Sequence, residues 1–136
     1  MQVSPELGPL ALAYVGDAVY SLFVREYVVR RGPAKGRHLH QATVCEVRAA
    51  AQARSLASLE DQLTEQERSI VRWARNAKAS RGRGSTVAQR HQATAFEALL
   101  GYLHLTGQNQ RLQALLTKVA NQVSGTGEDE RERHLA

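Results

Sequence analysis

The sequence predicts an all-α protein, and three features of its 136 residues lead to that fold class. Proline occurs only at positions 5, 9 and 33, so long segments are free of helix breakers. Runs of alternating β-branched residues, which would indicate strands, are absent, while apolar residues recur at helical spacing. The length fits one domain with a single modest core. We expect that domain to be 1–123, followed by a charged tail, 124–136, without fixed structure.

The first helix is expected from about Pro9 to Arg31. Proline is favoured in the first helical turn, and the segment RRGPAKG ends the helical pattern. Apolar side chains occupy both sides of this helix, which predicts a central and buried position. Gly16 and Ala18 flank Asp17 and would let another backbone come close.

Two further helices are expected before residue 78. An alanine-rich one should cover about His38 to Leu56, where small side chains favour close helix packing. Another should begin at Thr64, because Thr64 and Glu67 form a capping-box pattern. The predicted apolar stripe of this helix consists of Ile70, Trp73, Ala74 and Ala77.

A loop and two helices are expected in the second half of the chain. Residues 78–89, KASRGRGSTVAQ, are rich in Gly, Ser and Arg and lack an apolar period, so they should form a loop. A helix should follow over about 89–105, with Gly107 as its C-cap. The last helix should cover about 108–123.

The composition indicates which kind of partner and which cellular compartment to expect. The net charge of +5 and the pI of about 9.9 favour an anionic partner such as nucleic acid, although a solvated basic surface would give the same numbers. The single cysteine, Cys45, excludes an internal disulfide and fits a reducing compartment. No secretory leader is visible, and Arg25 and Glu26 interrupt the longest apolar window. We therefore expect a cytoplasmic protein without a membrane anchor.

Two predicted helices each carry one isolated carboxylate. Asp17 is the only charged residue within 7–24, and Glu97 is the only acid within 68–127. An ionised carboxylate among apolar residues is costly unless it is paired, hydrogen-bonded or bound to a metal. Mg²⁺ needs only one or two protein carboxylates when substrate phosphates complete its shell, so the two could form such a site. The alternative is a structural network, with partners among Tyr14, Ser21, Arg90 and His104.

The segment 68–91 is basic and contains no acid. A helix with an arginine stripe that leads into a Gly/Arg loop suits phosphate contacts. Aromatic residues are scarce, at 5%, which favours recognition of a duplex backbone over base stacking. The alternative is a solvated helix face and a linker. The basic residues of the segment are Arg68, Arg72, Arg75, Lys78, Arg81, Arg83 and Arg90.

Several segments resemble a known family. LAYVGDAVYSL at 12–22 and ATAFEALLGYLHL at 93–105 resemble the two helical motifs that supply the metal-binding acids of the ribonuclease III catalytic domain. RNAK at 75–78, LHQATVCEVRAAAQA at 39–53 and FEALLGYLHL at 96–105 are similar to its small branch, Mini-ribonuclease III. Together these motifs are specific, and the resemblance covers the chain as far as the charged tail.

The resemblance implies a fold and an activity. The fold would be the all-α ribonuclease III endonuclease domain, as a homodimer and without a double-stranded RNA-binding domain. The activity would be hydrolysis of double-stranded RNA, with Mg²⁺ or its substitute Mn²⁺, to 5′-phosphate and 3′-hydroxyl ends. The substrate implied is a large-subunit (23S) ribosomal RNA precursor, which a ribosomal-protein helper could shape.

The resemblance also assigns roles to residues. Asp17 and Glu97 would be the catalytic acids and the metal ligands. The implied RNA-binding residues are Arg72, Arg75, Asn76, Lys78, Arg81, Arg83 and Arg90.

Two of the four acids of standard ribonuclease III are replaced here. Ala13 stands four residues before Asp17 in place of a glutamate, and Thr94 stands three residues before Glu97 in place of an aspartate. The Mini-ribonuclease III branch resembles this chain in that reduction, which leaves the number of metal ions open. It also leaves a rival hypothesis, a ribonuclease III-fold dimer that binds double-stranded RNA without cleaving it. A second rival is an unrelated helical DNA-binding or scaffold protein.

Overall fold

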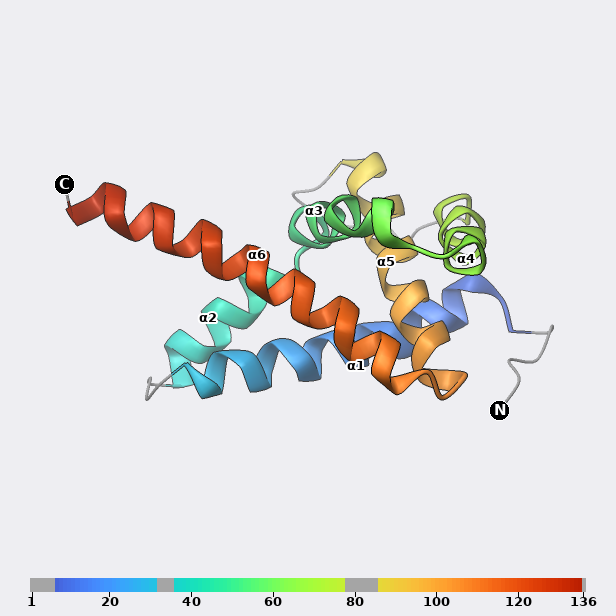
Figure 1. The fold of residues 1–136 in the computed structure, drawn as a ribbon, viewed down its shortest axis with the longest axis horizontal. Helices are drawn as coiled ribbons and strands as arrows, with labels where there is room; N and C mark the ends of the chain where they lie inside the picture. Colours follow the sequence, from blue (N-terminus) through green and yellow to red (C-terminus); the bar gives the residue numbers. More distant parts are fainter. Residues whose placement is uncertain (1–6, 32–35, 78–85, 136) are drawn as a thin grey trace.

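The structure is a computed structural model that describes residues 7–31, 36–77 and 86–135, with side chains described at all of these except 45, 46 and 123–135. These residues form helices joined by short turns, with no strand among them, which confirms the all-α prediction. Helix α5 (Val87–Leu105) packs against α1, α3, α4 and α6 (Figure 1). No helix of the described part is long and apolar enough to cross a membrane.

Helix α1 (Pro9–Arg30) begins with proline in its first turn, as predicted, and packs mainly on α5. Only one side of α1 is buried in this structure. The other side exposes Leu10, Tyr14 and Leu22, with 82% of Tyr14 accessible. The prediction of a helix buried all round is therefore wrong for the single chain, because α5 and its neighbours cover only the side that consists of Leu12, Ala13, Gly16, Tyr20 and Val24.

The alanine-rich segment forms two helices, α2 (Gly36–Val47) and α3 (Ala49–Leu59), where one was predicted over 38–56. Arg48 adopts an extended backbone (φ −64°, ψ 151°), and this single residue ends one helix and begins the next. The buried Gln52 side chain donates to the Val47 carbonyl at 2.7 Å and so satisfies a group left over at the break.

A short 3₁₀ turn, η1 (Glu60–Gln62), leads into α4 (Glu65–Arg75). The capping box at its start is confirmed: Glu67 N donates to Thr64 Oγ1 at 3.2 Å, and Thr64 N donates to Glu67 Oε1 at 2.9 Å. The predicted apolar stripe is wrong for Trp73, which is 44% exposed. The buried side of α4, on which the helix rests, consists of Glu67, Val71 and Ala74.

Helix α5 begins slightly before the predicted start, because Thr86 and Gln89 form a second capping box. Gly107 has a positive φ of 74° just after the helix, as expected of a glycine C-cap. Helix α6 (Asn109–Leu135) extends beyond the end predicted at Val123. The division of the chain into a domain of 1–123 and a separate tail stays a prediction.

Glu67 has a second role, which the sequence did not predict: its side chain joins α4 to α6. Its side chain is almost completely buried, and its two oxygens accept from Arg111 Nε and Nη2, both at 2.9 Å. Arg111 Nη2 also donates to the carbonyl of Gln62 at 2.7 Å. Burial alone would raise the pKa of Glu67, but the hydrogen bonds from Arg111 and Thr64 outweigh it and hold the pKa below its usual value.

Arg111→Met should lower the free energy of unfolding at pH 7 by about 2–4 kcal/mol, because it leaves a buried carboxylate without its partner. The stabilisation by Glu67 is present above the ordinary glutamate pKa and is lost as pH falls through its lower folded value. The difference in the free energy of unfolding between Arg111→Met and the unaltered protein should therefore become smaller at acidic pH. Urea unfolding at several pH values measures both effects. Arg54→Met, on the exposed side of α3, is the matched control, and an equal loss in both variants would contradict this assignment.

Candidate active site

Helices α1 and α5 cross in direct backbone contact at two glycines. A Cβ at Gly16 would lie 1.6 Å from the carbonyl oxygen of Glu97, and a Cβ at Gly101 would lie 1.9 Å from that of Leu12. Real Cβ atoms do not approach backbone so closely, so only glycine allows this crossing. The close backbone approach predicted beside Asp17 is confirmed at Gly16.

This crossing brings the two isolated carboxylates together. Asp17 follows Gly16 on α1, and Gly16 touches the backbone of Glu97 itself. Asp17 is exposed and Glu97 is half-buried. Burial, and to a smaller extent the negative charge of Asp17, raise the pKa of Glu97 to about 8. The two acids therefore share one electrostatic environment, in which full ionisation of both is unfavourable.

The structural network considered as the alternative is not found around this pair. Neither Asp17 nor Glu97 forms a hydrogen bond or an ion pair within the described part of the chain. Tyr14 and His104, two of the partners considered, are exposed. Negative charge that is concentrated at the crossing thus has no partner among the described side chains.

The donor set fits a divalent cation. Carboxylate oxygens are hard ligands that suit Mg²⁺ or Mn²⁺, and a cation would favour the ionised form of Glu97. Among the described residues there is no group of three or more His, Cys, Asp and Glu around a common point. Water and substrate oxygens would therefore have to complete the coordination of an ion held by Asp17 and Glu97.

The two residues that replace acids of standard ribonuclease III, Ala13 and Thr94, supply no further carboxylate at this crossing. Ala13 is buried and has no ligand atom. Thr94 lies one turn before Glu97, and its hydroxyl donates to the carbonyl of Arg90 at 2.9 Å. The carboxylate pair is thus the acidic part of the site.

The predicted RNA-binding residues are only partly described. Arg72 is exposed on α4, and Asn76 is the exposed C-cap of that helix. Arg90 is half-buried on α5, two turns before Glu97 on the same side of the helix. Lys78, Arg81 and Arg83 lie outside the described residues.

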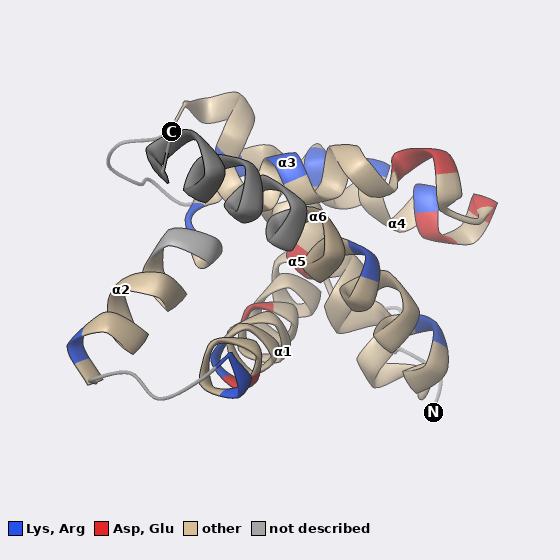
Figure 2. Ribbon diagram, turned by 60° about the vertical axis from the view of Figure 1, so that its left-hand side comes forward, with Lys and Arg blue, Asp and Glu red and all other residues tan. Residues whose placement is uncertain are grey.

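Arg75 is held by residues that the sequence analysis did not single out. Its Nε donates to Gln92 Oε1 at 3.0 Å, and its Nη2 donates to Glu60 Oε1 at 2.8 Å. His91 Nδ1 lies 2.6 Å from the backbone carbonyl oxygen of Arg75. These partners are common polar residues that are distant in sequence, so no pattern pointed to them. Acidic residues gather near η1 and the start of α4, whereas α1 and α5 carry few (Figure 2).

Comparisons with known proteins place the chain in one family. Residues 10–108 match the Ribonuclease III domain family. The chain is 46% identical over 111 residues to Mini-ribonuclease 3 of Thermoanaerobacter sp. (strain X514), covering 81% of this chain and 78% of the relative. It is 45% identical over 116 residues to Mini-ribonuclease 3 of Symbiobacterium thermophilum, covering 85% and 89%. A crystal structure of a Fusobacterium nucleatum protein superposes with a TM-score of 0.80 at 26% identity, covering 86% of this chain and 94% of that one.

The described residues form an all-α domain in which two carboxylates without a hydrogen-bonding partner in that part of the chain lie at the crossing of α1 and α5, an arrangement that can hold a divalent cation. The chain belongs to the ribonuclease III family, in its Mini-ribonuclease III branch, and is an endoribonuclease. The resemblance of the two helical motifs to this family is thereby confirmed.

Gly101→Ala should lower the free energy of unfolding by about 3 kcal/mol or more, because its methyl group would force α1 and α5 apart. Gly8→Ala is the matched control, since a Cβ there meets nothing within 4 Å. Urea unfolding measures the difference. Equal stability of the two variants would show that the crossing tolerates separation.

In metal-free protein, stability should fall as pH rises from about 4.5 to about 8. The folded state binds the Glu97 proton more tightly than the unfolded chain, so this stabilisation is complete below the ordinary pKa and is lost as pH rises through the folded value. Each unit of pKa shift corresponds to about 1.4 kcal/mol. Glu97→Gln should remove the decline, and Glu26→Gln, an exposed control, should not. Urea unfolding in EDTA between pH 5 and 9 tests this, and a decline unchanged in Glu97→Gln would contradict it.

Proposed function

We propose that this endoribonuclease cleaves double-stranded RNA by Mg²⁺-dependent hydrolysis, with Mn²⁺ as a substitute, and leaves 5′-phosphate and 3′-hydroxyl ends. The observation that carries the proposal is the pair of carboxylates Asp17 and Glu97 at the α1–α5 crossing, which have no hydrogen-bonding partner among the described side chains. The net charge of +5 supports an anionic substrate. The similarity to Mini-ribonuclease 3 proteins supports RNA as that substrate.

The side chains divide the work between holding the cation and holding the RNA. Asp17 and Glu97 would ligate the ion, and Glu97 would give up its proton when the ion binds, because its pKa is about 8 in the metal-free protein. A bound divalent cation supplies an acidified water and neutralises charge on the scissile phosphate. Arg72, Arg75 and Arg90 would bind backbone phosphates and so fix the strand beside the acids.

The exposed side of α1 supports a homodimer. Leu10, Tyr14 and Leu22 are large apolar side chains on a helix whose opposite side forms the core. Covering them with a second copy would remove this apolar surface from water. A two-fold axis beside α1 would place two carboxylate pairs near one duplex, one pair for each strand.

The physiological substrate proposed is a precursor of large-subunit (23S) ribosomal RNA, cleaved in the cytoplasm, with or without a ribosomal protein that shapes it. Support comes from the similarity to the Mini-ribonuclease III branch, which extends over most of the chain. The rival hypothesis of a catalytically inactive dimer that binds double-stranded RNA rests on Ala13 and Thr94, which replace two acids. One assay separates the two.

Asp17→Asn and Glu97→Gln should each reduce cleavage of duplex RNA more than about 100-fold, because even residues that only support metal ligands contribute up to that factor. Both variants should still bind the duplex, and EDTA should abolish cleavage by the unaltered protein. Single-turnover cleavage and filter binding measure the two properties, with Glu26→Gln as the control. Intact RNA bound equally by all proteins would favour the inactive dimer, and cleavage that persists in EDTA would contradict the metal site.

A further inference from the structure

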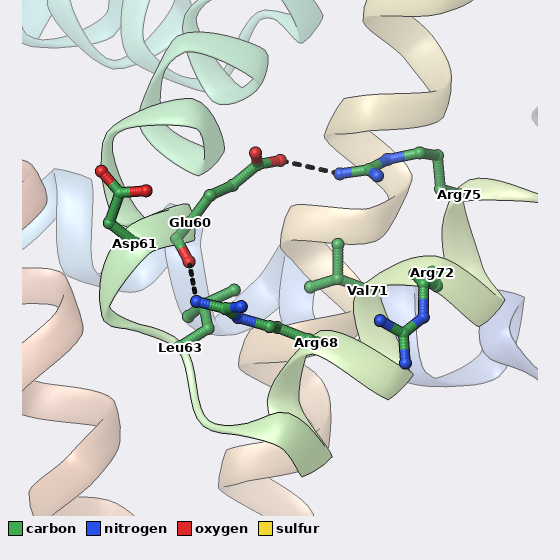
Figure 3. A pocket seen from close by; sticks show the side chains of 7 residues that line it. All are labelled: Glu60, Asp61, Leu63, Arg68, Val71, Arg72 and Arg75. Carbon is green, nitrogen blue, oxygen red and sulfur yellow. Dashed lines mark hydrogen bonds and ion pairs between the residues drawn. The ribbon is translucent and has the colours of Figure 1, made fainter.

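A polar pocket lies between η1 and α4 and has a volume of about 280 Å³ (Figure 3). Its wall includes three arginines, Arg68, Arg72 and Arg75, and two acids, Glu60 and Asp61. Neither Asp17 nor Glu97 lines it. The pocket is therefore distinct from the carboxylate pair, and its excess of guanidinium groups suits an anion.

Glu60 holds two of the three arginines through different atoms. Its carboxylate accepts from Arg75 Nη2 at 2.8 Å, and its backbone carbonyl accepts from Arg68 Nη2 at 3.2 Å. Figure 3 shows both interactions, with the Arg75 side chain at the Glu60 carboxylate and the Arg68 side chain at the Glu60 backbone carbonyl. Arg72 is exposed and forms no hydrogen bond or ion pair within the described residues.

The Glu60 carboxylate occupies a position that a phosphate oxygen could take. Arginine binds phosphate by directing two neighbouring N–H groups at two oxygens. On Arg75, Nε already donates to Gln92 and Nη2 to Glu60, so the Nε–Nη2 edge, one of the two edges suited to such binding, is filled by a carboxylate and an amide oxygen. A phosphate that binds this edge must compete with Glu60.

The ion pair between Arg75 and Glu60 is accessible to solvent, so a phosphate can compete for Arg75. The Arg75 side chain is 33% exposed and that of Glu60 is 50% exposed. Solvent-accessible pairs of this kind contribute little to stability, so the pair can open at small cost. The contrast with Glu67 is direct, since that carboxylate is 4% exposed in its pair with Arg111 and holds two helices together.

We propose that the pocket between η1 and α4 binds a phosphate group of the RNA backbone, and that Glu60 is a built-in competitor that the phosphate displaces from Arg75. The proposal rests on the RNA substrate proposed above. Glu60 and Asp61 weaken the attraction of the three arginines for an isolated anion, so a phosphate enters most readily when the rest of a duplex is bound elsewhere on the protein. Glu60 thereby acts as a specificity-determining residue that weakens binding of short or free anions.

Glu60→Gln tests the competitor role, because it keeps an acceptor oxygen and removes the charge. Binding of a duplex RNA in EDTA should become roughly two- to fivefold tighter, the range expected for an exposed ion pair. Asp61→Asn, which removes a charge from the same pocket without an ion pair to Arg75, should change binding less. In an Arg75→Met background, Glu60→Gln should change binding no more than Asp61→Asn does, because only the loss of charge remains. Thermal melting of each variant checks that it is folded.

The outcomes separate this proposal from the function on which it rests. If the unaltered protein binds the duplex but Glu60→Gln matches Asp61→Asn, the pocket responds only to net charge, and the competitor role is wrong while the RNA substrate stands. Weaker binding by Glu60→Gln would make Glu60 a support for Arg75 and would also overturn the proposal. Absence of duplex binding by the unaltered protein would overturn the proposed substrate itself.

Inorganic phosphate serves as a second probe of the pocket. Added at the ionic strength of a chloride control, it should not displace the duplex from the unaltered protein, because Glu60 and Asp61 disfavour a free anion. Displacement by inorganic phosphate would identify a site for free phosphate and overturn the assignment to the RNA backbone.

Discussion

The backbone contact between Gly16 on α1 and Gly101 on α5 is the constraint on which the rest of the structure depends. Each glycine lies so close to the opposite helix that a single methyl group would collide with a carbonyl oxygen. This approach lets Tyr20 and Phe96 pack edge to face, with ring centroids 5.0 Å apart, in the core below it. It also sets Asp17 beside Glu97, so one contact determines both the central packing and the position of the acids.

Two glutamates, Glu67 and Glu97, have opposite roles in this chain. Glu67 is enclosed with Arg111 and the α4 N-terminus, and these partners keep its pKa below the usual value despite burial. Glu97 has burial and the charge of Asp17 acting in the same direction, and its pKa rises to about 8. The first arrangement satisfies the carboxylate and stabilises the fold. The arrangement around Glu97 disfavours its ionised form, and a bound cation would stabilise that form. Strongly shifted pKa values of this kind are typical of functional sites.

Much of the fold could be predicted because local signals are strong in this chain. Pro9, the capping box at Thr64 and the glycine at 107 mark helix ends through backbone chemistry that acts over a few residues. The break at Arg48 was missed, since neither proline nor glycine marks it and the alanines on both sides favour a continuous helix. The exposed side of α1 was also missed, because periodicity shows which residues are apolar and not which neighbours cover them.

The sequence by itself determined the fold class, the family and the two acids, because isolated charges in apolar helices and the motifs around them can be recognised without coordinates. Only the tertiary structure decided that the two acids share one electrostatic environment, that hydrogen-bonding partners are absent around them in the described residues, and that Glu60 and Gln92 bind the Arg75 side chain. These features join residues that are far apart in sequence. Pairing of this kind is set by the helix crossing and the packing of side chains, and periodicity within one segment carries no information about it.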